Sequence, residues 1–242
     1  MSNYKLIIQY DGTNYCGWQI QNNGISIQKT IVDSVKILTG EEVNLVGSGR
    51  TDSGVHALGQ VANFKSDQDL EPKKFSYSLN SILPKDISVK DIEIVNENFH
   101  SRFDARKRSY LYLFSKTKSP FYDNYSYRYF NEINIRKMNE LGKLLSGEKD
   151  FTSFCKKESD VENKICNVFN IHWKETGDFV IFFIEANRFL HGMVRTIIGT
   201  LLSVSKSGNA EEEIIRIIKA KNREEAGESV PAKGLFLYKV KY

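Results

Sequence analysis

The stretch LVGSGRTDSGVHALGQVANF, residues Leu45–Phe64, places Arg50 and Asp52 among glycines and serines directly before a strand-like run. It matches neither common phosphate-binding signature. A dinucleotide fingerprint needs glycine where Asp52 stands, and a P-loop needs lysine where Val55 stands. A carboxylate would also repel a bound phosphate. The stretch is therefore predicted to present Asp52 for chemistry rather than to wrap a nucleotide.

A structural interpretation of the same stretch stays open, in which Asp52 caps a turn and Arg50 is an ordinary surface charge. The density of small residues argues against it. They are Gly47, Ser48, Gly49, Ser53 and Gly54. Because such residues let the backbone of another molecule approach closely, they favour the functional interpretation.

The composition is that of an ordinary globular protein. With 242 residues, 40% hydrophobic and 26% charged, the chain can form one large domain or two small ones. No apolar run reaches the roughly 20 residues that a membrane helix needs, and the N-terminus lacks a signal-peptide pattern. Cys16, Cys155 and Cys166 have no metal-ligand spacing, and their odd number is typical of reduced thiols. We expect a cytoplasmic protein without a metal site or a membrane segment.

Positive charge and aromatic side chains are concentrated between Phe99 and Arg128, in a chain whose formal net charge is +4. Asp104 and Asp123 are the acidic residues of this segment. Its basic residues are Arg102, Arg106, Lys107, Arg108, Lys116, Lys118 and Arg128. Basic and aromatic side chains together suit the phosphates and unstacked bases of RNA. A solvated basic face over core aromatics explains the segment equally well.

The first half of the chain alternates strand and helix patterns. We predict strands over residues 4–10, 43–46, 55–64 and 87–95, and helices over residues 27–39 and 72–83. Ser26 is the predicted N-cap of the first helix, Gly40 ends it, and Gly59 marks a bulge in the third strand. The apolar stripe of the first helix is formed by Ile27, Ile31, Val35 and Leu38. This βαββαβ order is typical of a small α+β domain with a mainly antiparallel sheet.

The second half has a similar pattern. We predict strands over residues 108–114, 165–173, 179–186 and 235–241, and helices over residues 133–145, 189–204 and 211–220. Tyr110, Tyr112 and Phe114 alternate on one face of a strand. His191 and Arg195 are predicted to lie one turn apart on a helix. We therefore expect two α+β domains, residues 1–105 and 106–242.

The segment GSGRTDSGVHALGQV resembles the signature loop of the TruA family of tRNA pseudouridine synthases, whose usual form is close to GAGRTDAGVHA. Ser48 and Ser53 stand where alanine is commoner, and both are small enough to keep the loop intact. Five further segments resemble the family in order along the chain. They are YDGTNYCGWQIQ, SIQKTI, FHSRFDARKRSYLYLF, NRFLHGMVRTIIGTLLSV and VPAKGLFLYKVKY. Together these matches are specific, although each short one alone would be weak.

The resemblance implies a pseudouridine synthase fold: two similar α/β halves with mainly antiparallel sheets and an active-site cleft between them. It implies that Asp52 is the catalytic carboxylate, that Tyr110 stacks on the target uracil, and that Arg195 forms an ion pair with the aspartate. Neither a metal nor a cofactor is needed for this chemistry. Arg50 is our candidate to fill the space that an extruded uridine leaves. From the residues alone, Tyr110 would be a core aromatic and Arg195 a surface charge.

The resemblance also implies a homodimer that acts on the anticodon stem-loop of tRNA, at positions 38, 39 and 40. Two alternatives stay open, namely a related synthase that acts on ribosomal RNA and a non-catalytic RNA-binding module. The second alternative is disfavoured because an RNA-binding module has little need of a buried carboxylate beside RNA, whereas Asp52 and its expected partners are all present.

Overall fold

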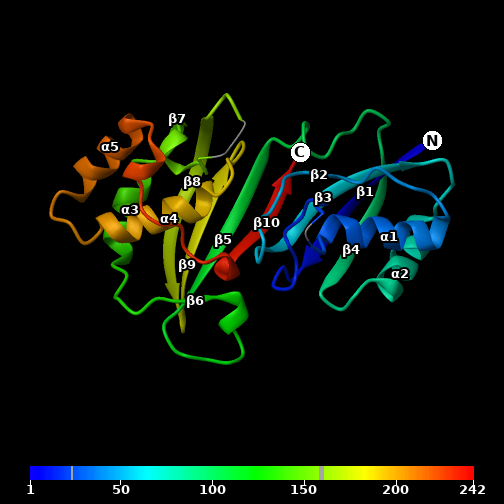
Figure 1. Ribbon diagram of the computed structural model, residues 1–242, viewed down its shortest axis with the longest axis horizontal. Coiled ribbons are helices and arrows are strands. Elements are labelled where there is room, and N and C mark those ends of the chain that lie inside the picture. Colours follow the sequence, from blue (N-terminus) through cyan, green and yellow to red (C-terminus); the bar gives the residue numbers. More distant parts are fainter. Residues whose placement is uncertain (23, 158–160) are drawn as a thin grey trace. The chain divides into compact units, whose positions relative to one another are not determined.

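The chain folds into two compact units, described here from a computed structural model of residues 1–22, 24–157 and 161–242. Unit 1 comprises Met1–Arg106 and Phe236–Tyr242, and unit 2 comprises Lys107–Leu235. Each unit combines a mostly antiparallel sheet with helices (Figure 1). This arrangement confirms the predicted α+β class. None of the helices in the described ranges has the length and apolar character needed to cross a membrane.

The first six elements of unit 1 have the predicted βαββαβ order, and the C-terminal strand that was predicted over residues 235–241 joins them as a seventh. The elements of unit 1 are β1 (Ser2–Tyr10), α1 (Ile27–Thr39), β2 (Val46–Gly47), β3 (His56–Ser66), α2 (Pro72–Ile82), β4 (Ile87–Val95) and, from Phe236 onward, β10 (Leu235–Lys241). The strand order is β4-β1-β3-β10, with β2 beside β3. Strand β10 runs parallel to β3, whereas β1 is antiparallel to both β3 and β4.

The core of unit 1 lies between its sheet and its helices. In β1 the alternating residues Tyr4, Leu6 and Ile8 are fully buried, which is the pattern of a strand with one covered face. Helices α1 and α2 contact each other, and α2 packs against β4 (Figure 1). Three residues of the apolar stripe predicted for α1 are buried, namely Ile27, Ile31 and Val35. The prediction is wrong for the fourth, Leu38, which is 36% exposed.

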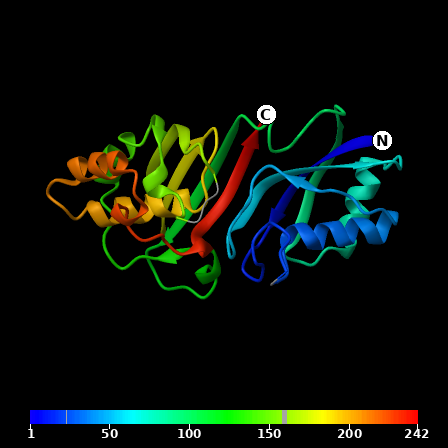
Figure 2. The same ribbon diagram turned by 45° about the horizontal axis from the view of Figure 1, so that its top comes forward.

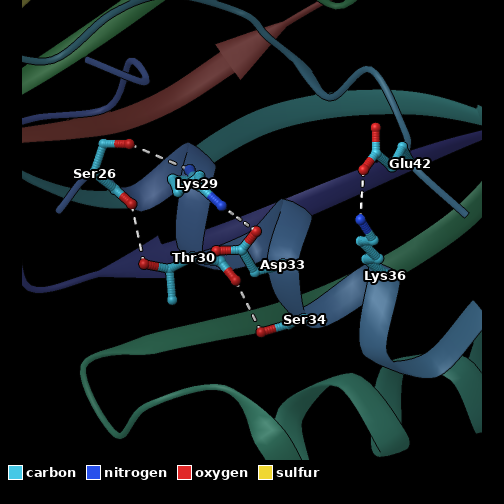
Figure 3. Close-up of polar contacts among 7 residues, drawn as sticks. All are labelled: Ser26, Lys29, Thr30, Asp33, Ser34, Lys36 and Glu42. Carbon is cyan, nitrogen blue, oxygen red and sulfur yellow. Dashed lines mark hydrogen bonds and ion pairs between the residues drawn. The ribbon is translucent and has the colours of Figure 1, made fainter. Parts of the chain in front are cut away.

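The ends of α1 are fixed by the two predicted residues. The Ser26 hydroxyl accepts a hydrogen bond from the Lys29 amide at 3.2 Å, as Figure 3 shows, and this satisfies one of the free amides at the helix start. Gly40 ends the helix with a φ of 74°, a left-handed conformation that favours glycine. Figure 3 also shows side-chain pairs along the exposed side of α1, such as Lys29 with Asp33. Exposed pairs of this kind contribute little stability.

The predicted bulge at Gly59 is confirmed by the strand register. Ile8 faces Gln60 and Tyr10 faces Ala57, so that two residues of β3, Leu58 and Gly59, lie opposite the single residue between Ile8 and Tyr10. A bulge changes the direction of the side chains that follow it, and Gln60 is the first residue after this bulge.

Unit 2 contains the remaining elements. They are β5 (Lys107–Ser115), β6 (Tyr127–Arg128), α3 (Ile135–Lys143), β7 (Gly147–Asp150), β8 (Ile165–Thr176), β9 (Phe179–Ala186), α4 (Met193–Val204) and α5 (Ala210–Ala220). Short 3-10 helices cover Asp123–Tyr125, Thr152–Phe154, Arg223–Glu225 and Ala232–Gly234. The strand order is β5-β9-β8-β7, with β6 beside β5. Helices α3, α4 and α5 contact one another, and Figures 1 and 2 show them gathered beside the sheet of this unit.

Several predicted boundaries are wrong, and three elements show the clearest differences. The strand expected over residues 43–46 is reduced to Val46–Gly47, and the helix expected over residues 133–145 is shorter, Ile135–Lys143. The helix expected from residue 189 begins at Met193, because Gly192 adopts a left-handed conformation with a φ of 72° and serves as its N-cap. His191 therefore lies in the turn before α4 rather than on the helix.

Candidate active-site residues

The loop that carries Arg50 and Asp52 leaves β2 at Gly47 and returns to β3 at His56. Gly47 is required by packing, because a Cβ atom there would lie 2.6 Å from the indole of Trp18. Farther along, the Val55 amide donates to the Asp52 carbonyl at 3.2 Å and closes a turn. Gly54 occupies this turn with a φ of 74°, a value that suits glycine at the third position of a β-turn.

Thr51, between Arg50 and Asp52, is the central anchor of the loop. It is 7% exposed. Its hydroxyl lies 2.8 Å from the Tyr10 hydroxyl, and its carbonyl accepts from the Trp18 amide at 3.1 Å. Both the side chain and the main chain of Thr51 are thereby fixed to unit 1.

Ser53 anchors the loop on the far side of Asp52, because its hydroxyl donates to the Tyr15 carbonyl at 3.1 Å. Asp52 is half-buried and Arg50 is exposed. Thr51 and Ser53 are thus each tied to other segments of unit 1, with Asp52 between them and Arg50 directly before Thr51. Such a loop holds a carboxylate in place without wrapping a phosphate.

His56 is 1% exposed and stacks on Phe236, with the ring centroids 4.7 Å apart. Its Nδ1 atom accepts from the Gly12 amide at 3.1 Å and lies 3.1 Å from Asp11 Oδ1. It thereby ties the loop after β1 to the start of β3. Among the described residues, no group of three or more His, Cys, Asp or Glu side chains could hold a metal ion.

Tyr110 belongs to unit 2, on the buried face of β5 together with Tyr112 and Phe114. Its ring meets that of Phe189 edge to face, with centroids 5.1 Å apart, a favourable aromatic geometry. It is 8% exposed, whereas Tyr112 and Phe114 are essentially inaccessible. Tyr110 is therefore the most exposed of the three aromatic residues Tyr110, Tyr112 and Phe114, which form the aromatic row of β5.

Arg195 lies in the first turn of α4 and is held by a neighbouring segment of unit 2. Its Nε atom donates to the Val230 carbonyl at 2.7 Å, and the Val230 amide donates to the Arg195 carbonyl at 3.2 Å. The Tyr112 hydroxyl donates to the next carbonyl, that of Pro231, at 2.8 Å. Burial raises the pKa of the Tyr112 phenol, and the charge of Arg195 opposes this rise. The segment at Val230 and Pro231 thus orients the guanidinium.

The basic segment between Phe99 and Arg128 divides its aromatic residues between core and surface. Tyr112 and Phe114 are buried, whereas Phe103 and Phe121 are 76% and 86% exposed. Several of its basic side chains are also exposed, namely Arg102, Arg106, Lys116 and Lys118. The strand of this segment builds the core, and its flanks present charged and aromatic side chains to solvent. Binding of RNA by these flanks stays a prediction.

Arg50 and Asp52 thus lie on one loop of unit 1, and Tyr110 and Arg195 lie in unit 2 on a strand and a helix. The anchoring residues Tyr10, Trp18 and Val230 were not predicted from the sequence. Each is remote along the chain from the residue that it holds and lies in an ordinary strand or loop, so no local pattern distinguishes it.

Comparisons with known proteins identify the family. The family model described as tRNA pseudouridine synthase matches residues 6–104 and 142–242. The chain is 43% identical over 244 residues to tRNA pseudouridine synthase A of Caldicellulosiruptor saccharolyticus, and 41% identical over 244 residues to that of Thermoanaerobacter sp. strain X514, with full coverage of both chains in each case. It is also 41% identical to the Bacteroides fragilis protein of that name, over 99% of this chain and 96% of the other.

A chain of the solved Cbf5-Nop10-Gar1 complex aligns with 81% of this chain and 43% of its own length, at 15% identity and a TM-score of 0.35, values too low to support an argument. The full-length sequence matches and the family model agree with each other and with the α+β fold. The chain belongs to the tRNA pseudouridine synthase family, a family of isomerases.

Proposed function

We propose that this enzyme converts uridine to pseudouridine in the anticodon stem-loop of tRNA, at positions 38, 39 and 40, with Asp52 as the catalytic carboxylate. The observation that carries the proposal is the anchoring of the loop on both sides of Asp52. Thr51 and Ser53 are each hydrogen-bonded to other segments of unit 1. A carboxylate that starts from a fixed main chain can be held near its reacting atom, which is a large part of enzymatic rate enhancement.

The reaction breaks the N1–C1′ bond of uridine and forms a C5–C1′ bond. C5 loses a proton and N1 gains one, so atoms and electrons balance without an oxidant or a second substrate. Asp52 supplies the single carboxylate that attacks or deprotonates the nucleoside. It must be ionised to do so, and a guanidinium partner favours the ionised form.

Arg195 is the proposed guanidinium partner of Asp52. The hydrogen bond from Arg195 to the Val230 carbonyl supports this role. It fixes the plane of the guanidinium group, whose paired N–H donors can bind both oxygens of a carboxylate. Tyr110 is proposed to stack on the uracil and to assist removal of the C5 proton. Its partial exposure at the end of the aromatic row, with Phe189 against its edge, supports a role in contact with substrate.

Arg50 is proposed to fill the space that the extruded uridine leaves. Taking a base out of its stack costs a few kcal/mol, and an exposed long side chain two residues from Asp52 is suited to offset that cost. The exposed basic side chains of the 99–128 segment are proposed to contact the RNA backbone. The affinity for tRNA should then fall steeply as the salt concentration rises.

The enzyme is further proposed to act as a cytoplasmic homodimer. Support comes from the face of the sheet of unit 2 opposite Tyr110 and Tyr112. There Leu111 pairs across the strands with Phe183, and Leu113 with Ile181. All four side chains are intermediate in exposure, an apolar surface of the kind that interfaces between subunits cover.

The target positions are tested with unmodified tRNA transcripts that keep uridine at one of positions 38, 39 and 40 and carry cytidine at the other two. We expect pseudouridine at the remaining uridine in each transcript, and none in a transcript with cytidine at all three. A ribosomal RNA fragment serves as the comparison substrate. Conversion of that fragment in the absence of any tRNA product would contradict the proposal.

A further inference from the structure

Gln60 is a polar side chain in an apolar part of unit 1. It lies on β3 directly after the bulge, opposite Ile8, and it is 0% exposed. It shares its face of β3 with Ala62 and Phe64, which are also buried. Burying an amide is unfavourable unless its polar atoms are hydrogen-bonded. The bonds that Gln60 makes therefore indicate why a glutamine is placed there.

Both ends of the Gln60 amide bind the loop that carries Arg50 and Asp52. Its Nε2 atom donates to the Gly49 carbonyl at 2.9 Å, and its Oε1 atom accepts from the Ser48 hydroxyl at 2.7 Å. The main chain adds a third bond at the same place, from the Ser48 amide to the Val61 carbonyl at 2.7 Å. The side chain thus clamps two consecutive loop residues immediately before Arg50.

This clamp completes the set of anchors around the charged residues. Ser48 and Gly49 are held by Gln60, and Thr51 is held by Tyr10. Arg50 lies between these two fixed points. The carbonyl of Gly49 belongs to the peptide group that precedes Arg50, so the Gln60 amide sets the orientation of that peptide.

We propose that Gln60 is a positioning residue of the enzyme: it orients the Gly49 peptide so that the loop presents Arg50 and Asp52 in their reactive geometry. The inference rests on the proposed function of Asp52. It goes beyond that function by assigning the reactive geometry to a buried amide that contacts no substrate. Removing the clamp should slow the chemical step and leave the binding of tRNA largely unchanged.

Two variants remove the clamp in different ways. Gln60→Met keeps the length of the side chain without its polar ends. Gln60→Glu keeps an acceptor for the Ser48 hydroxyl but loses the donor to the Gly49 carbonyl. For both we expect the single-turnover rate to fall by about tenfold to a hundredfold, the loss typical of a displacement near 1 Å. The dissociation constant for tRNA should stay within about threefold of the wild-type value.

Asn80 provides a matched control. It also clamps main chain with both ends of a side-chain amide, donating to the Val89 carbonyl and accepting from the Val89 amide, each at 2.8 Å. This clamp joins α2 to β4 and does not touch the loop. Asn80→Leu should lower the free energy of unfolding while the rate per folded molecule stays at the wild-type level, with folded enzyme quantified by urea titration and circular dichroism.

Ser48→Ala adds a second test of the same clamp. In combination with Gln60→Met it should slow the reaction little beyond the single variant, because the two residues share one interaction. If both Gln60 variants keep a rate per folded molecule within about twofold of wild type, the inference is wrong. Absence of pseudouridine with the wild-type enzyme would instead contradict the proposed function, so the two failures are distinguishable.

Discussion

The hydroxyl oxygen of Tyr10 lies 2.8 Å from Oγ1 of Thr51. Both side chains are buried. Tyr10 ends β1, and Thr51 stands between the two charged residues of the loop. One buried hydrogen bond thus connects the first strand of the chain with the segment proposed to perform the chemistry, and it can be removed without changing the shape of either side chain.

Tyr10→Phe should lower both stability and turnover. It deprives the buried Thr51 hydroxyl of this partner, which costs about 1–2 kcal/mol in the free energy of unfolding. The single-turnover rate should fall by about threefold to tenfold, since the loop becomes less well placed. Tyr4→Phe is the control, because the Tyr4 hydroxyl donates to the Gln68 carbonyl and accepts from the Leu70 amide, away from the loop. Equal rate losses in the two variants would show that Tyr10 has no special effect on the loop.

Arg195→Lys tests the guanidinium. Lysine keeps the charge but lacks the fork and the Nε–H that donates to the Val230 carbonyl. We expect the single-turnover rate to fall by about tenfold to a hundredfold, as for loss of an oriented electrostatic contact. Tyr112→Phe is the matched control, because it loosens the same segment by removing the bond to the Pro231 carbonyl. A rate unaffected by Arg195→Lys, or lowered equally by Tyr112→Phe, would remove Arg195 from the chemistry.

The cysteines should react in a defined order. Burial raises the pKa of the Cys166 thiol from 9.0 to about 11, so at pH 8 it forms less of the reactive thiolate than an ordinary cysteine does. Cys155 and Cys166 are buried, whereas Cys16 is intermediate in exposure. Mass spectrometry of native protein treated with iodoacetamide should find Cys16 modified first, and denatured protein should be modified at all three. Prior labelling of Cys166 in the native state would contradict the structure.

The sequence predicted those elements whose signals are local. The alternation of apolar and polar residues predicted the strand of residues 87–95 with the bounds observed for β4. The cap residues Ser26 and Gly40 predicted the two ends of α1. The start of α4 was wrong because the apolar residues before Gly192 continue a helical pattern, although the left-handed glycine excludes them from the helix. The parallel pairing of β10 with β3 has no local signal, since a strand pattern does not specify its partner.

The candidate site was predictable to the same extent. Arg50 and Asp52 stand out because small residues surround them and because the segment resembles a family signature. The residues that hold the loop do not stand out. Tyr10 and Gln60 lie in strands β1 and β3, where no local sequence pattern distinguishes them. Their importance depends on hydrogen bonds that form only on folding. The sequence therefore indicated the side chains that are proposed to react, but it did not indicate the residues that hold their loop.

Asp52→Asn provides the most direct test, because it replaces the charged carboxylate with an uncharged amide of nearly the same shape. Single-turnover conversion of a uridine-containing anticodon stem-loop should fall by about a thousandfold or more, while the dissociation constant for the RNA stays within about threefold of wild type. Asp33→Asn, at an exposed position of α1, should react at the wild-type rate. Pseudouridine formation by Asp52→Asn at more than about a tenth of the wild-type rate would contradict the assignment of Asp52 as the catalytic carboxylate.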